Sequence, residues 1–221
     1  MVWSCLVSIL PGMAQTEKLT DYVNPFVGTD GYGNVYPGAQ IPFGGIQISP
    51  DTDSRFYDAA SGYKYNHLTL MGFSLTHLSG TGIPDLGDFL FIPGTGEMKL
   101  EPGTHEDPDQ GYRSRYSHDK EWASPNYYAV ELADYGVKAE MTSGVRSGMF
   151  RFTYPESDNA FIMIDMNHTL WQSCEWSNLR MINDSTITGY KLVKGWGPER
   201  HVYFKEVDRT ALCTRQKAGY L

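Results

Sequence analysis

The chain has 221 residues, enough for one large domain or two small ones, and all-β folds of this size commonly form a single domain. Its formal net charge of −8 argues against nucleic acid or an anionic membrane surface as a partner, because both require clustered Lys and Arg. Aromatic residues make up 14% of the chain and are joined by 23 glycines and 12 prolines, a composition that favours strands and turns over helices. The three cysteines are too few and too odd in number for a disulfide framework.

The amino terminus is typical of an exported protein. Val2 to Leu10 form a short apolar run, which cannot span a bilayer because a spanning helix needs about 20 residues. Small residues at Gly12 and Ala14 stand where a signal peptidase would cut. We therefore expect residues 1–14 to be a signal peptide and the protein to be secreted, periplasmic or associated with the outer surface. A buried amphipathic segment is the other interpretation.

Residues 21–39 contain too many glycines and prolines for a helix, and they predict an extended loop. The loop places aromatic rings beside backbone amides, a combination that binds sugars by stacking on their C–H faces and by hydrogen bonds to their hydroxyls. A surface loop packed by its own aromatic side chains is the alternative. The acidic turn that follows is not an EF-hand, because Arg55 and Phe56 stand where an oxygen ligand and a glycine are required.

Residues 72–92 are expected to form two strands around a polar loop. The first strand alternates with a period of about two, and the apolar run from Phe89 to Ile92 predicts a buried strand that ends at Pro93. Glycines in the loop allow a close approach to a ligand, and hydroxyl and carboxylate groups come from Ser79, Thr81, Asp85 and Asp88. The loop lacks the lysine and the following helix of a phosphate-binding loop. It suits a neutral, hydroxyl-rich ligand, or else it is an ordinary hairpin connection.

Strand signals recur through the rest of the chain at the spacing expected of a sandwich. They fall at residues 112–118, 127–133, 137–142, 146–154, 160–166, 186–193 and 201–204. The second and third of these should form a hairpin across Asp134–Gly136. Period-two spacing also places Tyr63, Tyr65 and His67 on one strand face. Since no segment keeps a helical period for three turns, the sequence predicts an all-β fold.

Motifs for catalysis are not evident in these residues. The chain contains no nucleophile elbow and no HExxH or CxxC pattern. The tightest cluster of titratable groups outside residues 72–92 is typical of a solvated strand end and consists of His118, Asp119 and Glu121. Three tryptophans are either core anchors or sugar platforms, with the core favoured: Trp171, Trp176 and Trp196.

A series of ordered motifs runs from residue 21 to residue 204. The first are Asn24–Thr29, Pro37–Ala39, Pro42–Gly44, Ser49–Thr52 and Ser61–Tyr63, followed by Gly72–Ser74, Thr76–Gly82 and Gly87–Asp88. The later ones are Gly111–Tyr112, Ser117–His118, Tyr127–Val130, Val137–Glu140 and Arg146–Gly148. In their order and coverage these motifs resemble the amino-terminal domain of glycoside hydrolase family 92.

The resemblance implies a large antiparallel β-sandwich of the galactose-mutarotase-like supersandwich type, which in this family packs against an (α/α)6-barrel domain that is missing from this chain. It also implies secreted, calcium-dependent, exo-acting α-mannosidases that invert the anomeric centre and remove terminal α-mannose, in α-1,2-type or related linkages, from N-glycans or mannans. Catalytic carboxylates and most calcium ligands belong to the barrel, so no catalytic residue or metal ligand is assigned and the chain alone should be inactive. A free-standing carbohydrate-binding module and a structural sandwich without a ligand are the alternatives.

By the same resemblance, one wall of a mannose pocket is expected from Phe26, Gly28, Thr29, Arg55, Tyr57, His77 and Asp85. These residues would stack on the sugar or bind its hydroxyls without transferring protons. Tyr57, Ala60 and Leu75 replace a tryptophan, a cysteine and a histidine that are common in the family, so linkage preference does not follow from the resemblance. Alternation is expected to end after Phe204, and we hypothesise that residues 205–221 are an atypical tail produced by a frameshift or truncation.

Overall fold

The computed structural model describes residues 17–54 and 59–207, so the expected signal peptide and most of the expected tail lie outside the described residues. Strands dominate this part of the chain, and it contains no α-helix. Its helical elements are single 3-10 turns, such as η1 (Leu19–Tyr22), η3 (Pro108–Gln110) and η4 (His118–Lys120). No helix in these two ranges has the length and apolar character needed to cross a bilayer. The predicted all-β fold class is confirmed.

Two four-stranded antiparallel sheets form the sandwich. One has the order β1-β3-β4-β10 and is built from β1 (Ser49–Asp51), β3 (Gly72–Ser74), β4 (Leu90–Thr95) and β10 (Ala160–Asp165). The other has the order β6-β7-β8-β9 and is built from β6 (Glu121–Ser124), β7 (Tyr127–Leu132), β8 (Val137–Ser143) and β9 (Gly148–Thr153). A short pair of strands, β2 (Thr69–Leu70) and β5 (Ser114–Arg115), joins them.

The hydrophobic core lies between these sheets. Phe73 of β3 has ring centroids 6.5 Å and 6.3 Å from Phe150 and Phe152 of β9, so the two sheets face each other through aromatic side chains. Strand β8 contributes Val137, Ala139 and other alternating residues to the same cluster, as the period-two pattern predicts. The predicted hairpin is confirmed, since β7 and β8 pair directly across the turn.

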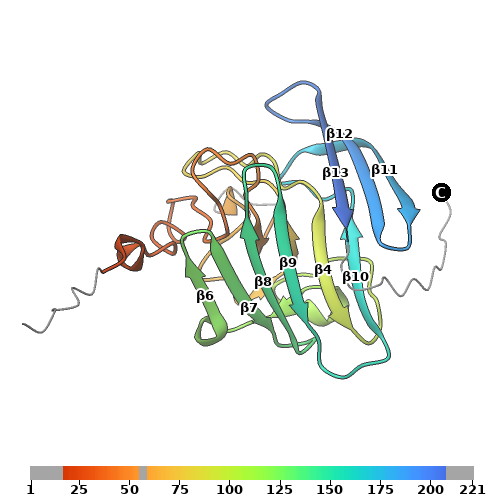
Figure 1. Ribbon diagram of the computed structural model, residues 1–221, viewed down its shortest axis with the longest axis horizontal. Coiled ribbons are helices and arrows are strands. Elements are labelled where there is room, and N and C mark those ends of the chain that lie inside the picture. The colour runs from red at the N-terminus through yellow and green to blue at the C-terminus, as the bar shows by residue number, and fades with distance from the viewer. Residues whose placement is uncertain (1–16, 55–58, 208–221) are drawn as a thin grey trace, which may run out of the picture.

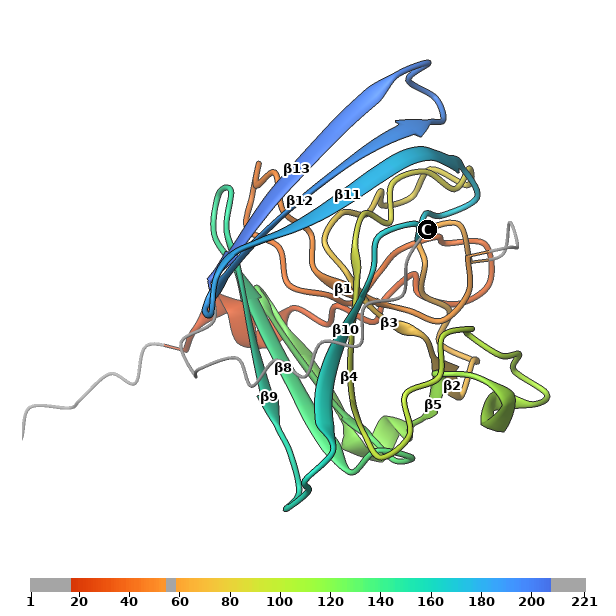
Figure 2. The ribbon, with the colours of Figure 1, turned by 90° about the vertical axis from the view of Figure 1, so that its right-hand side faces the viewer.

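A third, three-stranded sheet covers one end of the sandwich. It has the order β11-β12-β13 and contains β11 (Ser173–Asn183), β12 (Thr186–Lys194) and β13 (Arg200–Val207). Figure 1 shows these strands together at one side of the molecule, and Figure 2 shows them as a separate layer beside the loops of the first half. Alternation in β13 continues to Val207, beyond the expected end at Phe204.

Several sequence-based expectations are wrong in detail. Strand β11 was not predicted, because irregular pairing at Cys174/Trp176 and at Met181/Asn183 breaks its period of two. Strand β4 runs through Pro93 to Thr95 instead of ending there. Its pairing with β3 involves Phe91 alone, so Pro93 stands where β4 has a single neighbour, β10, and proline is tolerated at such an edge.

The segment of Tyr63, Tyr65 and His67 is also not a strand. The His67 N–H donates to the Lys64 carbonyl at 3.1 Å, which closes a turn, and Tyr63 is buried in the core while Tyr65 is partly exposed.

The predicted solvated cluster near residue 120 is solvated at Asp119 and partly at His118, but Glu121 is buried. The Glu121 carboxylate accepts hydrogen bonds from the Tyr63 hydroxyl at 2.9 Å and from the Tyr128 hydroxyl at 2.5 Å. It also lies 2.6 Å from Nδ1 of His118. The expectation failed because β6 and the turn around Tyr63 bury this carboxylate against the core, where it has to be satisfied by hydrogen-bond donors.

A buried ion-pair network attaches the third sheet to the rest of the fold. Nζ of Lys191, in β12, lies 3.1 Å from Oδ1 of Asp88 and donates to the His168 carbonyl at 2.5 Å. Arg200, at the start of β13, donates to the other oxygen of Asp88. Burial lowers the pKa of Lys191, whereas burial would raise the pKa of Asp88 but is outweighed by Lys191 and Arg200, which hold it low. The Phe204 ring adds an apolar contact with Phe89 at 4.6 Å.

We predict that Lys191→Met destabilises the chain by about 3 kcal/mol, because it leaves a buried carbonyl without its donor and removes one partner of a buried carboxylate. The measurement is the free energy of unfolding in urea. Lys194→Met on the same strand is the matched control, since Lys194 is exposed and should change stability little. Equal losses for the two variants would contradict a special role for the buried lysine.

Candidate functional site

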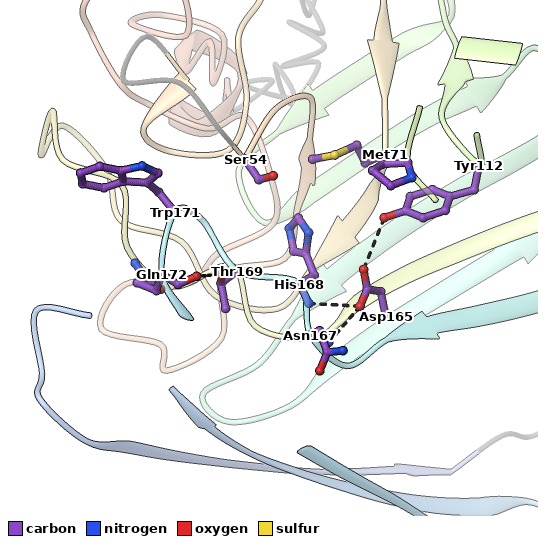
Figure 3. Close-up of a pocket in the computed structure, with 10 residues that line it drawn as sticks. Ser54, Met71, Tyr112, Asp165, Asn167, His168, Thr169, Trp171 and Gln172 are labelled. Carbon is purple, nitrogen blue, oxygen red and sulfur yellow. Dashed lines mark hydrogen bonds between the residues drawn. The ribbon is translucent and has the colours of Figure 1, made fainter. Parts of the chain in front are cut away.

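A cleft of about 570 Å³ opens beside the carboxyl end of β10 and the loop that leads to β11. Figure 3 shows Trp171 at one end and Tyr112 at the other, with Asp165 and His168 between them. The complete lining is Ser54, Met71, Pro102, Tyr112, Asp165, Asn167, His168, Thr169, Trp171 and Gln172. A separate, charged hollow of about 360 Å³ lies around Arg113.

Asp165, the last residue of β10, organises one side of the cleft. Its Oδ1 accepts hydrogen bonds from the backbone N–H groups of Asn167 at 2.9 Å and His168 at 3.2 Å, so the chain turns sharply as the strand ends. Its Oδ2 accepts from the Tyr112 hydroxyl at 3.4 Å. Burial raises the pKa of Tyr112, which keeps this hydroxyl protonated and able to donate.

Trp171 presents an indole ring to solvent from a tightly held turn. Its φ of 67° lies in the left-handed region, which a bulky residue adopts only where the surroundings enforce it. The Thr169 hydroxyl donates to the Gln172 carbonyl at 2.8 Å, and the Gln172 amide donates to the Leu170 carbonyl at 2.9 Å. Leu170 is buried, and its N–H donates to the Leu86 carbonyl at 2.9 Å. The turn is therefore fixed on both sides of the exposed ring.

The tryptophans are not core anchors, contrary to the favoured interpretation. Trp171, Trp176 and Trp196 are 56%, 55% and 62% exposed, because they lie on the third sheet and its connecting turns, outside the sandwich core. In the cleft, a flat apolar ring stands beside amide and carboxylate groups. Such a surface suits a ligand with apolar C–H faces and many hydroxyls.

A buried aspartate connects the cleft with His77. Oδ2 of Asp51 lies 2.8 Å from Nε2 of His168, and its Oδ1 lies 2.8 Å from Nε2 of His77. The other ring nitrogen of His77 lies 2.7 Å from the Gln47 carbonyl. Burial alone would raise the pKa of Asp51, but the two imidazoles hold it well below its ordinary value. Asp51 is therefore an anion that fixes the orientation of His168.

The residues expected from the loop at 21–39 contact one another or other parts of that loop, and they do not line the cleft. The Thr29 hydroxyl donates to the Phe26 carbonyl at 2.8 Å, and the Phe26 ring packs edge-on against Tyr65 at 5.8 Å. Gly28 has a φ of 85°, and its carbonyl accepts from the Val35 N–H at 3.2 Å. These contacts build a compact loop around its own aromatic side chains.

Of the remaining expected residues, His77 and Asp85 are described by the structure, and neither lines the cleft. His77 is buried behind Asp51, and Asp85 is buried beneath the β12–β13 turn, where it accepts a hydrogen bond from the Trp196 N–H at 3.0 Å. Arg55 and Tyr57 lie outside the described residues, although they follow Ser54, which lines the cleft. The role of all seven stays a prediction.

Apart from Trp171, which was considered as a core anchor or a sugar platform, sequence reasoning missed the residues that line this cleft. A usable signal was present, because a predicted strand at 160–166 is followed at once by Asn167, His168, Trp171 and Gln172, a polar and aromatic run at a strand end. What it could not show is that Tyr112 and Ser54 come to the same place.

The described residues do not fit a calcium site. Among residues 17–54 and 59–207, no group of three or more His, Cys, Asp or Glu side chains could hold a metal ion. Calcium prefers six to eight oxygen ligands, usually including several carboxylates. The cleft has a single one, Asp165, so no chemical step is assigned to a metal here.

We predict that Asp51→Asn destabilises the chain by roughly 3 kcal/mol at about pH 7, because it removes the buried carboxylate that pairs with both His77 and His168. The pKa of Asp51 is lower in the folded than in the unfolded chain, so its stabilisation is complete above the unfolded pKa and is lost as the pH falls. The difference in unfolding free energy from the unmodified chain should therefore be smaller at about pH 2.5 than at about pH 7, with the narrowing beginning near about pH 4.

Urea unfolding at the two pH values makes this measurement, with the exposed Asp119→Asn as the matched control. A difference that is constant with pH would contradict the assignment of Asp51 as the anion between two histidines.

The sequence and the fold were compared with known proteins. A family model described as the glycosyl hydrolase family 92 N-terminal domain matches residues 22–210. The solved structure of a family GH92 alpha-mannosidase from Bacteroides thetaiotaomicron is 99% identical, with a TM-score of 0.85, over 86% of this chain and 26% of its own. The same enzyme has been solved in complex with mannoimidazole.

Two more distant relatives are also named as glycosidases. A second solved glycosyl hydrolase of the GH92 family is 28% identical, with a TM-score of 0.69, over 84% of this chain and 26% of its own. An uncharacterised secreted glycosidase of Arthroderma benhamiae is 30% identical over 139 residues, which are 62% of this chain and 17% of that protein. This chain thus spans about a quarter of the solved relatives and less of the curated one. Since the family model covers most of its residues, the chain belongs to glycoside hydrolase family 92, as an N-terminal domain of that family.

Proposed function

We propose that this chain is the N-terminal, substrate-binding part of a secreted, exo-acting α-mannosidase. The observation that carries the proposal is the cleft, whose lining combines the exposed Trp171 ring with the polar side chains of Asp165, Asn167 and Gln172. The 99% identical relative is named an alpha-mannosidase and binds mannoimidazole, which supports mannose as the sugar. The relative from Arthroderma is named as secreted, which supports export.

In this proposal the cleft holds and orients sugar without breaking bonds. Trp171 would stack on a C–H face of mannose, and Asn167 and Gln172 would bind its hydroxyls. Arg55 and Tyr57, which follow Ser54 in the sequence, would extend this wall. Phe26, Gly28 and Thr29 would shape the loop of residues 21–39 next to it. His77 would act through Asp51 on His168, because it is buried behind that carboxylate. Holding the sugar in place supplies positioning and specificity.

The bond-breaking groups would belong to another part of the longer enzyme. Hydrolysis with inversion needs two carboxyl groups about 6.5–9.5 Å apart on either side of a water molecule. The cleft offers only Asp165 among the residues that line it. We therefore place the acid, the base and most calcium ligands on a C-terminal helical-barrel domain. The substrates would be N-glycans or mannans ending in α-1,2-linked or related mannose.

We predict that the purified 221-residue chain does not hydrolyse an aryl α-mannoside, with or without calcium, because the described residues that line the cleft include a single carboxyl group, that of Asp165. The measurement is release of the aryl alcohol over hours. The control is the same chain mixed with a separately produced C-terminal part of the longer enzyme. Turnover by the chain alone would contradict the division of roles proposed here.

We predict further that Trp171→Ala weakens binding of methyl α-mannoside by about tenfold, because a stacked aromatic ring contributes up to about 1.5 kcal/mol. Binding can be followed by ligand-observed NMR, which detects millimolar affinities. Trp176→Ala is the matched control, as Trp176 is equally exposed but lies on β11 outside the cleft lining. Equal weakening by both variants would count against the cleft. Micromolar binding by the chain alone would instead favour a free-standing carbohydrate-binding module.

A further inference from the structure

A second exposed tryptophan lies next to the cleft. Trp196 is 62% exposed and sits in the turn that connects β12 to β13. Figure 3 shows this turn, in blue, passing on the side of the cleft where Trp171 and Gln172 lie. An isolated exposed aromatic side chain is common on protein surfaces and by itself indicates no function. The way in which this turn is held is more specific.

The turn is fixed by Asp85. The Asp85 carboxylate accepts one hydrogen bond from the Trp196 N–H at 3.0 Å and another from its neighbour, the Leu86 N–H, at 2.6 Å. Arg200, at the other end of the turn, has Nη2 3.7 Å from Oδ1 of the same carboxylate. Asp85 is itself buried. The hydrogen bonds of this buried carboxylate therefore hold the Trp196 backbone in one position.

The same turn also touches the lining of the cleft. A Cβ atom added to Gly195 would lie 2.6 Å from Cγ of Gln172 and 3.2 Å from Oδ1 of Asp85, so only glycine allows this close approach. Gln172 lines the cleft directly after Trp171. The Trp196 turn and the Trp171 turn are thus packed against each other through Gln172, and both carry an exposed indole ring.

We propose that Trp196 is a second sugar platform, which contacts the unit next to the terminal mannose of an α-mannoside. The terminal mannose would occupy the cleft beside Trp171, and the next unit would lie against Trp196. Asp85 would be a positioning residue, which acts by holding the Trp196 turn and does not touch the sugar. This inference rests on the proposed function of the cleft and adds the residue that would contact the second sugar unit.

The experiment uses the whole chain labelled with fluorotryptophan, which contains five tryptophans. Fluorine NMR gives one resonance for each, assigned by single replacement with phenylalanine. An α-linked mannotriose should shift the resonances of both Trp171 and Trp196, whereas mannose should shift mainly that of Trp171. The resonances of Trp122 and Trp176, which are exposed elsewhere, should not move.

Variants measure the energetic contribution. Trp196→Ala should reduce the ratio of mannotriose affinity to mannose affinity by about fivefold, the size expected for one stacked ring. Asp85→Ala should reduce the same ratio, and Asp85→Asn, which keeps a hydrogen-bond acceptor for the Trp196 N–H, should restore part of it. Trp176→Ala should leave the ratio unchanged. A loss of general stability in the Asp85 variants would lower both affinities together and leave their ratio in place, so the ratio separates positioning from folding.

The outcomes distinguish a failure of the Trp196 platform from a failure of the proposed mannose site in the cleft. If mannotriose shifts Trp171 but not Trp196, the second platform is wrong and the cleft stands as a mannose site. If no mannoside shifts Trp171, the cleft is not the sugar site, and the second platform fails with it. Shifts of both resonances together with an unchanged ratio in Trp196→Ala would also overturn the inference, because Trp196 would then report binding without contributing to it.

Discussion

The structure depends on one buried carboxylate, that of Asp51. It lies between His77, 26 residues away in sequence, and His168, 117 residues away, at 2.8 Å from each ring. Strand β1, the loop after β3 and the loop after β10 are therefore tied at one point inside the protein. A buried charge is tolerated only when it is paired and hydrogen-bonded, so these segments must come together for Asp51 to be stable. The cleft forms where one of them, the loop after β10, reaches the surface.

The polar loop at residues 79–88 has a similar architectural role. Two of its carboxylates point inward and hold the third sheet, Asp88 through Lys191 and Arg200, and Asp85 through the Trp196 turn. Acidic residues that look like ligand-binding groups in the sequence are thus partners of cationic groups and backbone amides from a distant part of the chain. In the proposed function their contribution to sugar binding would be indirect, since they hold the third sheet and the turn that carries the exposed Trp196.

In the proposed function, the cleft performs one of the two tasks of a glycoside hydrolase. Side chains such as Trp171 and Asn167 can recognise a sugar, while a single lining carboxylate cannot supply the paired acid and base of an inverting reaction. Recognition and bond breaking would then lie on different domains of the longer enzyme.

The sequence by itself determined the fold class, most strands and the family, because these depend on local signals. Alternation specifies β7 and β8, and ordered motifs specify the family, whatever their distant neighbours are. Only the tertiary structure decided the partners of Asp51, Asp85 and Asp88, the exposure of Trp171, and the cleft between Ser54, Tyr112 and Gln172. The physical reason is that burial and ion pairing are long-range properties. A carboxylate in a glycine-rich loop has the same local sequence whether a sugar hydroxyl or a lysine from another sheet completes its hydrogen bonds.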